Sequence, residues 1–248
     1  MTESAGKQTL SEGVYLSLHR EMLNGHLMPG QRLKVSEIAG RFGVSLSVVR
    51  EALTRLAEHG LVVASPQRGF AVAALSVDDL RDLTRARVLV EALVLRESIA
   101  NGNVAWEASV VASLHTLERT PLLDDQGDIS DEWTAAHRAY HRSLLAGSGS
   151  TRLESVATAL RDCAELYRQW SRSLAHDEDR DIAAEHRHIM EATLARDADA
   201  ATAALTEHIE RTATVLLQYA EGRAASGSGT AQSTGDGHQI AGPRFSSV

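Results

Sequence analysis

Hydrophobic residues recur every three or four positions along most of the chain, which is the spacing of amphipathic helices. Before residue 75 this pattern predicts three short helices: one over residues 14–23, one from a cap at Ser36 to Gly43, and one from a cap at Ser45 or Ser47 to Gly60. Two apolar runs follow, at residues 61–64 and 70–73. The turn between them predicts a β-hairpin.

Three helices followed by a hairpin is the element order of a winged helix-turn-helix, and after it the pattern is helical only. Ser76, with Asp79 three residues on, opens the first of about six predicted helices. The fourth runs from a cap at Ser150 to about Leu174, the fifth covers residues 177–196, and the sixth ends near Glu221. The predicted fold class is therefore mainly α, a winged helix-turn-helix followed by an all-helical bundle.

This pattern divides the chain into four segments. We expect a flexible N-terminus at residues 1–9 and a DNA-binding domain at 10–74. A helical ligand-binding and dimerisation domain follows at 76–221. The remainder, 222–248, is predicted to be a disordered tail because it is rich in Gly, Ser and Thr and has little apolar content.

Charge and cysteine content narrow the class of protein. Residues 1–74 carry eight basic and six acidic side chains, a net charge of +2, whereas the remainder carries 17 basic and 27 acidic ones, a net charge of −10. A mildly basic small domain joined to an acidic larger one is typical of a nucleic-acid-binding domain linked to a regulatory domain. Cys163 is the only cysteine, which excludes an internal disulfide and a CxxC metal site. With no run of about 18 apolar residues, we expect a cytoplasmic protein and no membrane partner.

An ordered series of short motifs runs through the first domain. They are Leu27-x-Pro29-Gly30-x-x-Leu33, Ile38-Ala39-x-x-Phe42-Gly43-Val44-Ser45, Val49-Arg50-Glu51-Ala52-Leu53-x-x-Leu56, Gly60-Leu61-Val62 and Arg68-Gly69. With this spacing, the stretch resembles the N-terminal DNA-binding domain of the GntR family of bacterial transcription regulators. The resemblance implies that the partner is double-stranded operator DNA.

The side chains at the start of a recognition helix enter the major groove. Arg50 can contact the O6 and N7 atoms of guanine in a bidentate manner. Family members often have arginine where this chain has Leu46, which can instead contact a thymine methyl group. On the hairpin, Arg68 can enter the minor groove or touch phosphate, and Gly69 permits a close approach of the backbone. The predicted DNA-binding residues are Ser36, Ser45, Leu46, Ser47, Arg50, Arg68 and Gly69.

Four of the eleven histidines fall on the apolar faces of three predicted helices. His137 and His141 lie four residues apart on one helix, and His186 and His208 interrupt the apolar stripes of the last two. Burying several imidazoles without partners is costly, and a divalent metal would satisfy them. The alternative is a polar pocket of hydrogen-bonded histidines, because a single core histidine usually plays that part.

Residues 76–221 resemble the all-helical FCD effector domain of the FadR subfamily of GntR regulators. Similar members hold a divalent metal with an Asp-x-x-x-His pair, a histidine that opens a His-x-x-Ile segment, and a histidine about 22 residues later. Here His141, His186 and His208 match, and His137 stands where the family has aspartate. The resemblance implies a site of four neutral ligands, which favours zinc, or nickel, over manganese or magnesium. The departure at His137 leaves open that metal binding is lost.

Arg87 matches an arginine that is common on the first helix of this domain. It can clamp the carboxylate of an effector. Equally, it can form a structural ion pair with Glu91, four residues along the same helix. His188, two residues from His186, is expected to face solvent.

Together these features predict a homodimeric transcription regulator, a repressor rather than an enzyme. Its binding to a palindromic operator would respond to a small carboxylate effector at the metal site, through a change in the spacing or angle of the two DNA-binding domains. Two alternatives use the same histidines: a metal-dependent hydrolase or oxygenase, and a dedicated metal-ion sensor. Against the first, no motif places a carboxylate as general base, and Glu185 is expected on a different face from His186.

Overall fold

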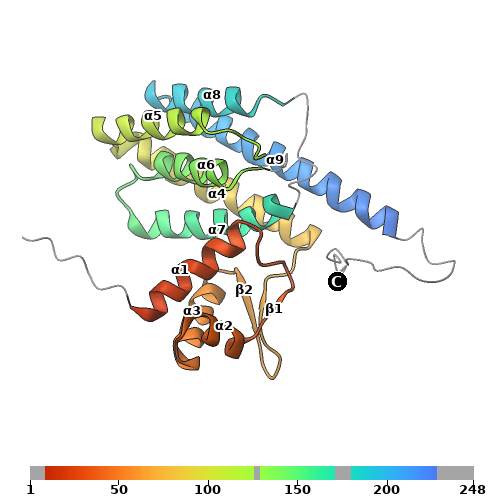
Figure 1. Cartoon of the computed structure of the whole chain (residues 1–248). Helices are drawn as coiled ribbons and strands as arrows, with labels where there is room; N and C mark the ends of the chain where they lie inside the picture. The colour runs from red at the N-terminus through yellow and green to blue at the C-terminus, as the bar shows by residue number, and fades with distance from the viewer. Residues whose placement is uncertain (1–8, 126–128, 171–179, 228–248) are drawn as a thin grey trace, which may run out of the picture. The chain divides into compact units, whose positions relative to one another are not determined.

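The computed structural model describes residues 9–125, 129–170 and 180–227. The chain forms two compact units, the first ending at Leu75 and the second beginning at Ser76 (Figure 1). Each unit has its own core.

The first unit contains three helices and a small sheet, and the predicted helix-helix-helix-hairpin order is confirmed. Its elements are α1 (Leu10–Leu23), β1 (Arg32–Leu33), α2 (Val35–Phe42), α3 (Leu46–Glu58), β2 (Val62–Ser65) and β3 (Gly69–Val72). The sheet is antiparallel with strand order β1-β3-β2, and β2 pairs with β3 from Val62 opposite Val72 to Ser65 opposite Gly69. Strand β1 was not predicted, because two residues are too few to show an alternating pattern.

The ends of α2 and α3 correct one prediction and refine another. Helix α2 begins at Val35, and Lys34 precedes it without a side-chain capping bond, so the assignment of Ser36 as the cap is wrong. The chain enters α2 one residue after β1 ends, which places Ser36 inside the first turn. Gly43 ends α2 with a φ of 65°, a conformation that glycine adopts readily. Ser45 is the cap of α3, because its hydroxyl accepts a hydrogen bond from the Val48 backbone N–H.

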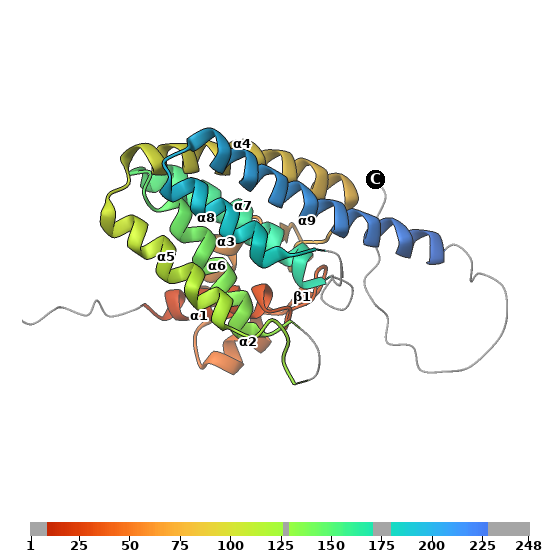
Figure 2. The same cartoon turned by 90° about the horizontal axis from the view of Figure 1, so that it is seen from above.

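The second unit is the predicted bundle of six helices, counted over the described residues. They are α4 (Val77–Asn101), α5 (Val104–Arg119), α6 (Asp131–Leu145), α7 (Thr151–Trp170), α8 (Ile182–Leu194) and α9 (Ala198–Gly227). Helices α4 and α9 run side by side (Figure 2). Helix α6 contributes Tyr140 and Leu144 to the centre of the core, where both are fully buried. Within the described residues, every helix is too short or too polar to span a lipid bilayer.

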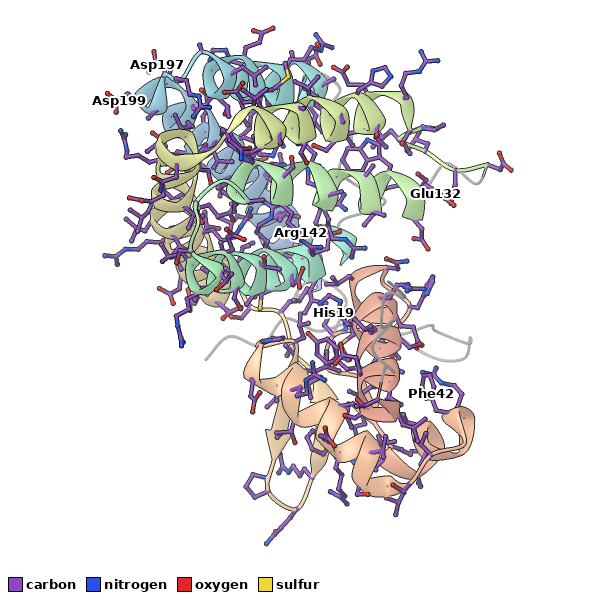
Figure 3. The ribbon with its side chains drawn as sticks, turned by 90° about the vertical axis from the view of Figure 1, so that its left-hand side faces the viewer. His19, Phe42, Glu132, Arg142, Asp197 and Asp199 are labelled. Atoms are coloured by element: carbon purple, nitrogen blue, oxygen red, sulfur yellow. The ribbon has the colours of Figure 1, made fainter. Side chains whose placement is uncertain are left out.

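The boundaries of α8 and α9 differ from the predicted ones. Helix α8 begins at Ile182, after the cap Asp181, and not at residue 177. The predicted end of the fourth helix at Leu174 lies outside the described residues. Helix α9 begins after Asp197, which lies with Asp199 at the start of the helix (Figure 3). It continues past its predicted end at Glu221 to Gly227, so the first residues of the predicted tail belong to this helix. The rest of that predicted tail, residues 228–248, lies outside the described residues.

Trp106 on α5 is held between two glycines. Its indole N–H donates to the backbone oxygen of Ser143 at 2.8 Å. A Cβ atom at Gly102 would lie 2.1 Å from the indole ring, and one at Gly147 would lie 2.8 Å from it. Both positions therefore require glycine for space.

Replacement of Gly102 by alanine is expected to lower the free energy of unfolding of the second unit by about 2 kcal/mol, because the added methyl group overpacks the core. Differential scanning calorimetry measures the effect as a lower Tm. Gly13→Ala in α1 is the control, since a Cβ there meets nothing within 4 Å. A Gly102→Ala protein that melts at the wild-type temperature would contradict the assignment.

Candidate functional site

The beginning of α3 presents the predicted DNA-binding side chains to solvent. Helix α3 buries Val49, Leu53 and Leu56 in the core of the first unit. Its other face, with Leu46 and Arg50, is therefore exposed, and Leu46 is 52% accessible.

The remaining predicted DNA contacts are also exposed. Ser45 and Ser47 lie at the start of α3 with their hydroxyl oxygens 2.8 Å apart, and Ser36 lies in the first turn of α2. At the hairpin, Gly69 has a φ of 81°, a conformation that favours glycine over other residues. Arg68 is exposed beside it, at the tip of the wing.

In the second unit, three helices bring four histidines together. His137 and His141 come from α6, His186 from α8 and His208 from α9. One nitrogen from each ring can be chosen so that all four lie within 4.8 Å of one another. All four side chains are buried, so the helical spacing in the sequence correctly placed these residues on inward faces.

Neighbouring side chains fix the orientation of these rings. Trp133 stacks on His137 with 4.8 Å between the ring centroids. The Tyr140 hydroxyl donates to the backbone oxygen of His186 at 2.8 Å, which ties α6 to α8. The Glu185 carboxylate lies 2.7 Å from Nδ1 of His208. Because Nδ1 of His208 is engaged with Glu185, Nε2 is the nitrogen of this ring that is available to bind an ion in the cluster.

Glu185 was not predicted as a member of the site. It lies on a different face of α8 from His186, as expected, but this face meets α9 and so reaches His208. The position of Glu185 next to His186 in the sequence gives no sign that its carboxylate contacts His208. Burial alone would raise the pKa of Glu185, but hydrogen bonds from Arg180 and His208 hold the pKa at about 2.

Burial keeps the imidazoles neutral. Loss of water lowers the pKa of His137, His141 and His186 well below the ordinary value, and it lowers the pKa of His208 as well. Nearby arginines add to the effect. Neutral imidazole is the form that binds a metal ion.

The residues fit a divalent metal ion. Among the described residues, Nε2 of His186 is buried without a hydrogen-bond partner, and a metal ion in the cluster would satisfy it. The Nε2 atoms of His137 and His141 are 3.2 Å apart, which suits two nitrogens that share one ion at Zn–N distances of about 2.0–2.1 Å. Unsatisfied ring nitrogens in a buried cluster are costly unless a ligand satisfies them. Borderline ions such as zinc suit this set of donors.

A cavity of about 220 Å³ opens beside the cluster, with His137, His141 and His208 in its wall. Four arginines also line it, and each contacts a carboxylate. Arg87 and Arg161 share Glu91. Arg168 pairs with Glu165, and Arg180 pairs with Glu185.

Arg87 forms one of the two interactions considered from the sequence and is placed where the other would have to occur. Its Nε donates to Glu91 at 2.7 Å, so the structural ion pair is present. It also lines the cavity, where a carboxylate clamp would have to lie. Glu91 is fully buried, and Arg87 and Arg161 together hold its pKa below the ordinary value despite the cost of burial.

Three further wall residues were missed although the sequence carries a signal for them. Arg161, Glu165 and Arg168 lie on α7 at spacings of four and three residues, which puts them on one helix face. Such a charged face is ordinarily solvated, so the spacing alone could not identify it as a cavity wall. His188 is exposed, as predicted.

Two family models match the chain. The model described as "Bacterial regulatory proteins, gntR family" matches residues 10–72, and the model of the FCD domain matches residues 82–211. These are the two units of the structure, with the exposed α3 in the first and the histidine cluster in the second.

Similar proteins agree with these matches. The HTH-type transcriptional regulator BphR of Paraburkholderia xenovorans is 34% identical over 219 residues, which cover 87% of this chain and 88% of BphR. The HTH-type transcriptional repressor GlaR of Escherichia coli is 31% identical over 211 residues, which cover 84% of this chain and 96% of GlaR. The solved structure of E. coli McbR/YncC has the same fold, with a TM-score of 0.74 and 21% identity over 85% of this chain and 98% of that one. The chain belongs to the GntR family of bacterial transcription regulators, and an FCD domain follows its DNA-binding domain in the sequence.

Proposed function

We propose that the protein is a repressor whose affinity for operator DNA is controlled by a small carboxylate effector bound beside a divalent metal ion. The observation that carries this proposal is the cluster of four buried, neutral imidazoles, three of which line a cavity together with four arginines. His137, His141, His186 and His208 would hold the ion, which we expect to be zinc. A bound ion would add positive charge and Lewis acidity to a wall that already attracts carboxylates.

The DNA-binding part of the proposal rests on α3 and the hairpin. Arg50 and the two serines at the start of α3 would contact base edges and phosphates in the major groove. Arg68 and Gly69 at the wing would approach the backbone or the minor groove.

We infer a homodimer on a palindromic operator. Leu89 and Leu93 lie one turn apart on α4 and are 63% and 50% exposed. Apolar side chains paired on one helix face favour a contact between two protein surfaces. A twofold dimer carries two DNA-binding domains and so requires two symmetric half-sites.

The route from effector to DNA-binding domain runs through α7 and Ser76. The Tyr167 hydroxyl on α7 accepts from the Ser76 N–H at 3.2 Å and lies 2.5 Å from the Asp79 carboxylate. Ser76 directly follows the last residue of the first unit. Arg168, next to Tyr167, lines the cavity. A shift of α7 on effector binding would therefore reach the junction with the DNA-binding domain.

Replacement of Tyr167 by phenylalanine is expected to uncouple the two events. Zinc content and effector affinity stay at wild-type levels, because the ring is kept and the hydroxyl does not line the cavity. The effector concentration that half-releases operator rises about tenfold, within the range of allosteric coupling energies. Calorimetry measures the affinity for the effector. Fluorescence anisotropy of labelled operator measures the effector concentration that half-releases the DNA.

Asp79→Asn should produce a similar shift in release. Asp78→Asn, whose carboxylate pairs with Arg81 at 3.3 Å, is the matched control and should leave release unchanged. If the Tyr167→Phe protein releases operator DNA at the same effector concentration as the wild type, the proposed route is wrong.

The carboxylates at the site also bear on the enzymatic alternative. Glu165 contacts Arg168, and Glu185 contacts both Arg180 and His208. Each is engaged in an ion pair with an arginine, and neither is placed as a free general base. This arrangement favours a binding site over a hydrolytic one.

The experiment that tests the function is the capture of genomic DNA. The zinc-loaded protein is incubated with sheared DNA from its source, and the retained fragments are sequenced. A few sharp peaks that share a palindrome are expected, and genes beside them that handle carboxylic acids would nominate effectors. Addition of such an acid should then release the DNA.

Two results would overturn parts of the proposal. No enrichment, with or without zinc, contradicts operator binding. Release by zinc alone, with no acid present, contradicts control by a metabolite and identifies a metal sensor.

A further inference from the structure

The cavity beside the histidines has a predominantly apolar wall. Twelve of its twenty-two lining residues are aliphatic or aromatic, among them Leu83 from α4, Ile209 and Leu216 from α9, and Leu122 from the segment before α6. An engineered apolar cavity of about 150 Å³ holds benzene. At about 220 Å³, this cavity has room for a ring and a short polar group.

The side-chain charges in the wall are nearly balanced, and a bound metal ion would add its own positive charge to them. Four arginines line the cavity, and the carboxylates that contact them are Glu91, Glu165 and Glu185. The excess arises because Arg87 and Arg161 share Glu91, at 2.7 Å and 2.8 Å. Among the described residues, Arg87 and Arg161 therefore have one carboxylate between them, whereas Arg168 pairs with Glu165, and Arg180 pairs with Glu185, which Arg211 also contacts at 3.5 Å.

We propose that the effector is a monocarboxylic acid that carries one ring, or a branched alkyl group of similar size. Its carboxylate would be held between the Arg87–Arg161 pair and the histidine cluster, and its apolar group would lie against Leu83, Ile209 and Leu216. This inference rests on the proposed function and specifies the chemical class of the effector.

Dicarboxylates and sugar acids fit the same wall less well. A second carboxylate would have to compete with Glu165 or Glu185 for a guanidinium that is already paired. A row of hydroxyl groups would lose its hydrogen bonds to water against an apolar surface. Each buried methylene, by contrast, tightens binding roughly fourfold.

The test is calorimetric titration of the zinc-loaded protein with four probes. Phenyllactate, lactate and malate share an α-hydroxy acid group and differ in the rest of the molecule, and 3-phenyl-1,2-propanediol keeps the ring without the carboxylate. Phenyllactate is expected to bind on the order of 100-fold more tightly than lactate. Malate should bind no more tightly than lactate, and the diol should not bind detectably.

The outcomes separate this inference from the proposed function. Malate that binds as tightly as phenyllactate overturns the inference and leaves an acid-responsive regulator intact. Tight binding of the diol overturns the role of the carboxylate. No binding by any of the three acids to protein that holds zinc contradicts both.

Two variants locate the apolar group. Ala213→Leu adds bulk to the cavity wall and should weaken phenyllactate binding at least tenfold, and lactate binding far less. Leu122→Ser removes apolar surface from a residue that is 42% exposed and so does not threaten folding. It should weaken phenyllactate binding several-fold. Val104→Ser, at an exposed residue outside the cavity wall, is the control. Equal losses for phenyllactate and lactate in both cavity variants would overturn the placement.

Discussion

Replacement of Arg50 by alanine is expected to lower operator affinity by on the order of 100-fold and to leave the fold intact. A bidentate contact between arginine and guanine is worth about 1–3 kcal/mol of discrimination, and a dimer makes the contact twice. Arg50 is exposed on α3, so its loss leaves no cavity in the core. Fluorescence anisotropy at one fixed salt concentration, with the palindrome from genomic capture, measures the affinity.

Two further variants separate geometry from charge. Arg50→Lys keeps the positive charge but lacks the planar fork, and it should lose most of the specific affinity while it keeps nonspecific binding. Arg85→Ala removes the same charge from an exposed position on α4 and should leave the affinity unchanged. If Arg50→Ala binds the operator as tightly as the wild type, α3 does not read the major groove through this residue.

Much of the DNA-binding domain was predictable because its signals are local. Gly43 ends α2 and Ser45 caps α3 through contacts within a few residues, and the hairpin strands are apolar runs on either side of a turn. The error at Ser36 has the same origin. A serine before an apolar run indicates a cap, but the short β1 sets the start of α2 earlier, at Val35.

Of the candidate site in the second unit, only the four histidines and Arg87 were predictable from the sequence. Helical periodicity placed the four histidines on buried faces, and the structure brings them together. What surrounds them depends on contacts between helices that are distant in sequence, such as Glu185 with His208 and Arg161 with Glu91 across 70 residues. Glu185 and Arg161 each follow the pattern of an ordinary surface charge in the sequence. Only the packing of the helices brings Arg161 into the cavity wall and Glu185 against His208.

Replacement of His141 by alanine is expected to abolish tight metal binding. His141 is 1% exposed, and its Nε2 lies 3.2 Å from that of His137, so its loss removes a central member of the set. The wild-type protein, dialysed after exposure to zinc, should hold about one ion per chain by mass spectrometry, and the variant less than a tenth of that. Zinc at 1,000 times its Kd should stabilise the wild type by about 4 kcal/mol, a gain that the variant lacks.

The control for this prediction is a histidine on α8, the helix that carries His186. His188→Ala on α8 removes an exposed histidine and should leave zinc content unchanged, whereas His208→Ala should behave like His141→Ala. Circular dichroism checks that each variant keeps its helices. Because the buried imidazoles are already neutral, zinc uptake by the wild type at pH 7 should release almost no protons from them. Full zinc occupancy in both the His141→Ala and His208→Ala proteins would show that these four histidines are a polar core cluster rather than a metal site.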